Sequence, residues 1–110
     1  MPADPREARA LRWARTTYAA GNVVLVNRPG RLYCARMVMR GTGQAEQLVA
    51  LHDAATVVTD LPSLLLILDA NNASPDDWPL TPVSMVFLEG LSVEWLGTAS
   101  AALFVGWEVD

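Results

Sequence analysis

Short segments in which apolar and polar residues alternate follow one another through most of this chain. The clearest three lie near the C-terminus, over 83–88, 91–96 and 101–109. Because successive side chains of a strand point to opposite faces, such segments predict strands with one buried face. Short Gly-containing turns separate the three segments, so we expect a meander in which neighbouring strands pair. This arrangement places Trp107 in the core and close to Trp95 across a strand pair.

The earlier part of the chain adds weaker signals of the same kind. Strands are predicted over 22–27, 32–40, 56–59 and 64–68, the last as a buried strand, and 70–82 is predicted as a long surface loop. Segment 47–53 suits a strand better than a helix. Within 32–40, alternation places Tyr33, Ala35, Met37 and Met39 on one face and Arg36 and Arg40 on the other. Seven or so short strands predict an all-β domain, an antiparallel β-sandwich or jelly roll, over residues 22–110.

Residues 1–21 differ from this pattern, and we assign them to a short N-terminal arm, helical or extended. Asp4 is placed to cap a helix, Pro5 suits its first position, and Glu7 completes a capping box. These signals predict a helix over about 5–16. A helix of this length is marginal alone in water, so it needs a packing partner, and Leu11 and Trp13 are its apolar contacts.

Charge is distributed unevenly along the 110 residues. The hydrophobic content of 52% argues against a disordered chain, and the formal net charge is −4. All eight basic residues are arginines within the first 40 positions, which carry a net +6, whereas 41–110 carry −10. No apolar run reaches the roughly 20 residues of a membrane span, and no apolar segment follows the first arginines as in a signal peptide. We therefore expect no membrane partner.

The arginines of the arm recur at every third position. Three interpretations remain open: a solvated terminus, a nucleic-acid contact through phosphates, or docking on an acidic surface of a neighbouring subunit or larger assembly. We favour docking, because the basic arm and the acidic body are already complementary in charge, whereas the acidic body would repel nucleic acid. The expected partner-binding residues are Arg6, Arg9, Arg12, Trp13, Arg15 and Tyr18.

Candidate chemistry is sparse. His52, beside Asp53, could act as a general base but is better explained as a residue at the end of a strand. Cys34 is predicted to be a half-buried structural thiol. Oxygen ligands for Ca²⁺ occur between Asp69 and Asp77, without the spacing of a known calcium loop. We therefore predict no enzyme activity, no catalytic residue, no metal and no cofactor.

Three stretches resemble small β-sandwich structural proteins of tailed-phage virions. They are PGRLYCARMVMRGTG from Pro29, LVALHDAATVVTD from Leu48, and FLEGLSVEWLGTASAALFVGWEVD from Phe87. The resemblance lies in the order of strands and turns. It implies a non-enzymatic virion protein, a capsid decoration (cement) protein, made in the host cytoplasm and commonly a homotrimer. A tail or fibre module is the alternative; outside this class stand a nucleic-acid-binding accessory protein and a small enzyme using His52.

Overall fold

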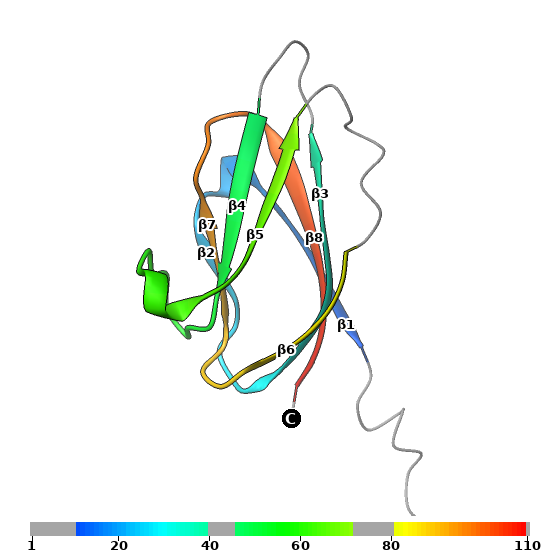
Figure 1. The fold of residues 1–110 in the computed structure, drawn as a ribbon, viewed down its shortest axis with the longest axis vertical. Coiled ribbons are helices and arrows are strands. Elements are labelled where there is room, and N and C mark those ends of the chain that lie inside the picture. Colours follow the sequence, from blue (N-terminus) through cyan, green and yellow to red (C-terminus); the bar gives the residue numbers. More distant parts are fainter. Residues whose placement is uncertain (1–10, 40–45, 72–80, 110) are drawn as a thin grey trace, which may run out of the picture.

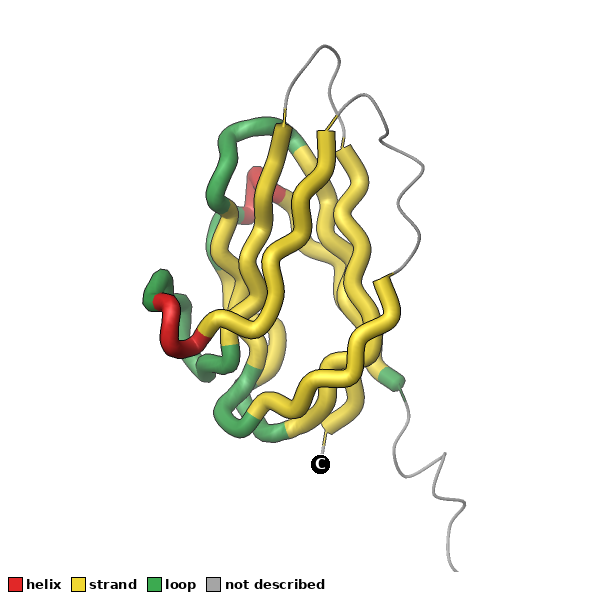
Figure 2. The backbone as a smooth tube through the Cα atoms, viewed as in Figure 1, coloured by secondary structure: helices red, strands yellow, loops and turns green. Residues whose placement is uncertain are grey.

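The computed structural model describes residues 11–39, 46–71 and 81–109, which form eight strands and two single-turn 3₁₀ helices (Figures 1 and 2). The strands are β1 Arg12–Thr17, β2 Val23–Val26, β3 Gly30–Met39, β4 Glu46–His52, β5 Leu64–Asn71, β6 Thr81–Phe87, β7 Leu91–Trp95 and β8 Ala101–Val109. The helices are η1 Tyr18–Ala20 and η2 Leu61–Ser63.

The strands form two four-stranded sheets, both antiparallel throughout. The first sheet has the order β1-β8-β3-β6 and the second the order β2-β7-β4-β5. The sheets lie against each other as two layers (Figure 1). The all-β sandwich expected from the sequence is confirmed.

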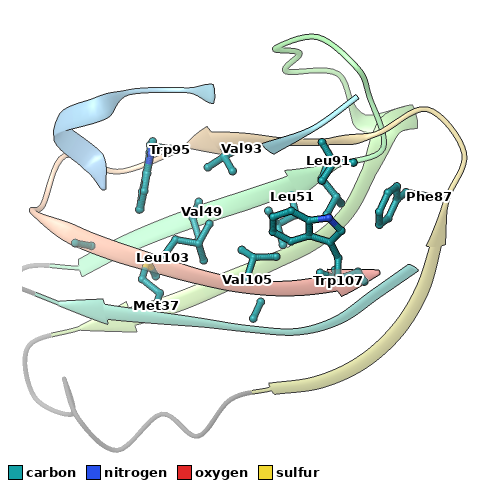
Figure 3. Packing of buried hydrophobic residues seen from close by; sticks show 14 of the residues in the cluster. Met37, Val49, Leu51, Phe87, Leu91, Val93, Trp95, Leu103, Val105 and Trp107 are labelled. Atoms are coloured by element: carbon teal, nitrogen blue, oxygen red, sulfur yellow. The ribbon is translucent and has the colours of Figure 1, made fainter. Parts of the chain in front are cut away.

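Apolar side chains from both sheets meet between the layers. From β8, Leu103, Val105 and Trp107 point into this space, and from β4 and β7 come Val49, Leu51, Leu91 and Val93 (Figure 3). Trp107 is only 6% exposed, so its predicted burial is confirmed. A period of two therefore marks the buried face of these strands correctly.

The predicted helix over 5–16 is wrong where the structure describes it. Residues 12–17 form strand β1, which pairs with β8 from Arg12 opposite Trp107 to Thr17 opposite Ala102. Residues 5–10 lie outside the described part. Pairing supplies β1 with backbone hydrogen bonds and an apolar neighbour that a lone short helix lacks, and Thr16 and Thr17 are β-branched residues that favour strands. Residues 12–17, which we assigned to the arm, are thus a strand of the sandwich.

The predicted meander is also wrong. Strand β6 pairs with β3, β7 pairs with β2 and β4, and β8 pairs with β1 and β3, so each of the last two turns carries the chain from one sheet to the other. Trp95 and Trp107 consequently belong to opposite sheets and lie at separate places in the core (Figure 3). An amphipathic strand buries its apolar face whether it pairs with the preceding strand in one sheet or lies opposite it in the other sheet. The alternation of apolar and polar residues therefore cannot distinguish the two arrangements.

Three smaller expectations need correction. A register shift between Leu32 and Cys34 turns Leu32 into the core beside Ala35, and leaves Tyr33 half-buried with its hydroxyl bound to Glu108. Residues 56–59 form no strand. Strand β5 exists, but it is the edge of the second sheet, and Ile67 is largely exposed rather than buried.

Candidate functional site

The outer face of the first sheet carries arginine and aromatic side chains in register. Because Leu103 and Val105 of β8 point into the core, their neighbour Phe104 points outward. Phe104 pairs with Arg15 of β1 on one side and with Arg36 of β3 on the other. Directly opposite residues have Cβ atoms about 4.5–5.5 Å apart, a spacing at which a guanidinium can lie over an aromatic ring. The result is a row, Arg15–Phe104–Arg36, across three strands.

The adjacent row is built around a glycine. Trp13 pairs with Gly106, and Gly106 pairs with Cys34. A Cβ added at Gly106 would lie 2.7 Å from the Cys34 sulfur and 3.1 Å from the Trp13 ring. The Trp13 ring therefore covers this position, and it remains 53% exposed to solvent. Only glycine leaves room for the ring at the centre of the sheet.

Cys34 is the neighbour of Gly106 on β3, and its sulfur is a half-buried thiol. Burial raises its pKa, and a backbone hydrogen bond involving Gly106 offsets part of that rise. A raised pKa leaves little thiolate at neutral pH, and the thiolate is the nucleophilic form. The environment is thus that of a structural cysteine.

A third row contains the one acidic residue of the first sheet. Arg31 pairs with Glu108 on one side and Val86 on the other. The Arg31 guanidinium donates to the Ser84 hydroxyl at 2.8 Å, and the Tyr33 hydroxyl donates to the Glu108 carboxylate at 2.7 Å. These bonds fix Arg31 and Glu108. We call the outward surface formed by Trp13, Arg15, Arg31, Arg36 and Phe104 the arginine face.

Charge is divided between the two sheets. The strands of the first sheet carry four arginines and one glutamate, a net of three positive charges. The strands of the second carry Glu46, Asp69 and Glu94 and no arginine, a net of three negative charges with His52 neutral. The contrast seen along the sequence thus becomes a contrast between the two sheets of one domain.

The structure places the predicted arm residues unequally. Trp13 and Arg15 point outward on β1 and belong to the arginine face, whereas Arg12 lies at the strand's end beside the core position of Trp107. Tyr18 is turned away from this face: its ring packs edge-on against Trp95, with centroids 6.0 Å apart. Arg6 and Arg9 lie outside the described residues.

Sequence reasoning missed three members of the arginine face, Arg31, Arg36 and Phe104. Alternation places Arg36 on the outward side of β3, where it is half-buried, but nothing local shows that it lies beside Phe104, 68 positions away. Only the pairing of β3 with β8 brings them together. The register of distant strands was the missing information.

His52 lies at the centre of a second cluster of polar side chains. It is only 2% exposed, and its Nδ1 lies 2.9 Å from the Ser63 hydroxyl and its Nε2 3.0 Å from a Glu94 oxygen. The Ser63 hydroxyl also donates to Asp60 at 2.8 Å. Each ring nitrogen of His52 therefore has a polar partner within hydrogen-bond distance. These contacts connect the η2 loop to β4 and β7.

A shallow groove of about 620 Å³ opens between β1 and β2, near the end of β8. Its lining combines two arginines, Arg12 and Arg28, with apolar residues of β2 and β8. His52 does not line it, so the groove and the His52 cluster are separate features. This groove therefore offers no substrate-binding site beside His52, as a catalytic base would need.

No group of three or more His, Cys, Asp or Glu side chains in the described part of the chain is arranged to hold a metal ion, and Asp76 and Asp77 of the possible calcium loop lie outside that part. No described helix is long and apolar enough to cross a membrane. No protein-family model, no curated protein and no solved structure matches this chain.

Proposed function

We propose that this protein is a non-enzymatic structural protein that binds an acidic protein surface on a larger particle through the arginine face. The observation that supports this most is the row Arg15–Phe104–Arg36, with the exposed ring of Trp13 beside it. Arginine and tryptophan are enriched at protein interfaces, where a planar guanidinium binds carboxylates and an aromatic ring supplies apolar area. Face-specific charge also steers the encounter of two proteins.

The particle that we favour is a phage virion, with the chain as a capsid decoration protein. Support for this comes from the resemblance in strand and turn order, and from a small β-sandwich that presents an exposed apolar and charged face. A tail or fibre module would use the same face. Localisation in the virion and attachment to a major capsid or other virion protein belong to the same proposal.

A second candidate is binding of single-stranded nucleic acid, which the alternation of aromatic and arginine side chains on an open sheet favours. Two observations make it the weaker candidate. Glu108 lies in the arginine face itself, where its carboxylate repels phosphates, and the strands of the second sheet carry a net negative charge that repels the same polyanion.

The test is to produce the chain together with the genes that neighbour its own and to purify the particles that form. The proposal expects the protein to sediment with particles at a fixed ratio, measured by mass spectrometry, and expects Arg15→Glu to remove it. Arg28→Glu is the matched control, because Arg28 is an exposed arginine outside the arginine face. Absence of the protein from particles, or equal retention of both variants, would overturn the proposal. Release by nuclease would support the nucleic-acid candidate instead.

A further inference from the structure

The outer face of the second sheet is complementary in charge to the arginine face. Its strands β4 and β5 place Leu48 beside Asp69 and Ala50 beside Ile67, on the side away from Val49 and Leu51. Glu46 and Asp69 are exposed, and so are the apolar side chains of Ile67 and Leu96. We call the surface formed by Glu46, Leu48, Ile67, Asp69 and Leu96 the acidic face. It combines carboxylates with apolar area, as the arginine face combines guanidinium groups with rings.

We infer that the acidic face is the docking site for the arginine face of a second copy of this chain. The inference rests on the proposed function, since it names the acidic partner of the same arginine face. Arg15 and Arg36 would meet Glu46 and Asp69, while Trp13 and Phe104 would cover Ile67 and Leu96. Each face has the charge that the other lacks, so like faces of two copies repel and unlike faces attract.

The contact is heterologous, because it joins two different surfaces. In a sandwich the two outer faces point in opposite directions (Figure 1). Copies joined in this way add one after another along a line, and the contact propagates as an open stack instead of closing into a ring. The terminal copy keeps an unoccupied arginine face, through which the stack can bind an acidic particle surface. This geometry does not produce the trimer that the resemblance implies.

The size of the contact sets its strength. A face of four strands is roughly 15–20 Å wide and ~20–25 Å long. The exposed part of the acidic face is smaller, because Ala50, His52 and Ser92 on the same side of the second sheet are buried, which places the contact near the lower limit of specific interfaces. Its charged pairs lie at a solvent-accessible surface and are screened by salt. Stacking should therefore be weak, dependent on concentration and sensitive to ionic strength.

Sedimentation velocity on the full chain tests the inference, over about 10 μM to 1 mM, where a weak contact becomes half-formed. The expected result is a weight-average mass that rises continuously with concentration and falls in high salt. Arg15→Glu and Asp69→Arg alter one exposed side chain on each face and should each remain monomeric at every concentration. An equimolar mixture of the two should associate, because each variant keeps one unaltered face. Arg28→Glu and Glu89→Arg, exposed residues of two turns, are the matched controls and should behave as the unaltered chain.

A chain that remains monomeric at about 1 mM overturns the inference, since that concentration half-forms even a weak contact. A fixed trimer, unaffected by either substitution, overturns it as well and places the interface elsewhere. The two proposals can fail separately. If the chain stays monomeric but sediments with particles unless Arg15→Glu is present, the inference fails and the proposed function stands, because the arginine face then binds another protein. If Arg15→Glu particles keep the protein, the proposed function fails whatever the stacking result.

Discussion

The carboxylate of Asp53 accepts the backbone N–H of Glu89 at 2.8 Å, and so joins the end of β4 to the turn between β6 and β7. The same carboxylate accepts N–H groups from Leu88 and Gly90. This turn takes the chain from the first sheet to the second, so Asp53 fixes one of the points where the two layers are connected. Asp53 therefore stabilises the turn between β6 and β7. It belongs to the HDAA stretch, on which part of the family resemblance rests.

Replacing Asp53 with alanine should lower the stability of the fold. Three backbone N–H groups lose a charged acceptor, and bonds to charged groups contribute roughly 1.5–3 kcal/mol each when buried. Since this turn is partly exposed, water replaces part of the loss, and we expect about 2–3 kcal/mol in total. Chemical denaturation measures it. Asp69→Ala, an exposed carboxylate with no such task, should change the stability by less than about 0.5 kcal/mol.

Gly106→Ala should destabilise the protein by about 1–3 kcal/mol, because its methyl group has no room between Cys34 and Trp13. Removing the Cys34 sulfur should relieve part of this steric clash. In the double variant with Cys34→Ala, part of the lost stability should return, which a double-mutant cycle detects as coupling between the two sites. Strictly additive losses would show that the added methyl group meets no resistance from Cys34.

The Cys34 thiol should react slowly with thiol-specific reagents at neutral pH. Burial raises its pKa, so the thiolate fraction is small and the rate should still be rising at a pH where an ordinary cysteine has reached its plateau. Trp13→Ala removes the ring from above the neighbouring Gly106 and should accelerate the reaction. A plateau at lower pH than that of a free thiol would contradict this account of the site.

Trp107→Ala should cost about 3–5 kcal/mol, a large part of the roughly 5–15 kcal/mol that stabilises a domain. Trp13→Ala is the matched control, and it should cost much less because that ring is half exposed. The reverse order, measured by denaturation, would contradict the position of Trp107 in the core.

The two core tryptophans should act independently. They belong to opposite sheets and lie at separate places between them, so Trp95→Phe and Trp107→Phe should have additive effects to within about 0.5 kcal/mol. The sequence alone suggests adjacent rings and hence strong coupling. A coupling energy above about 1 kcal/mol would favour that arrangement over the observed one.

How far the sequence predicts this fold depends on how local each signal is. Alternation locates β7 and β8 and the burial of Trp107, because a strand with one buried face repeats every two residues. It does not reveal which strand pairs with which, and so the crossings between sheets and the row Arg15–Phe104–Arg36 were missed. Tyr33 was misplaced because a bulge shifts the alternation by one residue, and β1 was missed because capping signals before it favoured a helix.

Oxidative footprinting of Trp13 decides whether the arginine face is the binding surface. The Trp13 ring is 53% exposed in the isolated domain, and Leu88, at 70%, lies on the β6–β7 turn and serves as an internal reference. We compare the free chain with the chain bound to its particle, and quantify oxidation of both side chains by mass spectrometry. We expect Trp13 to be strongly protected from oxidation on binding, while Leu88 stays as reactive as before. Bound protein in which Trp13 remains fully reactive would contradict it, because the arginine face would then not be the binding surface.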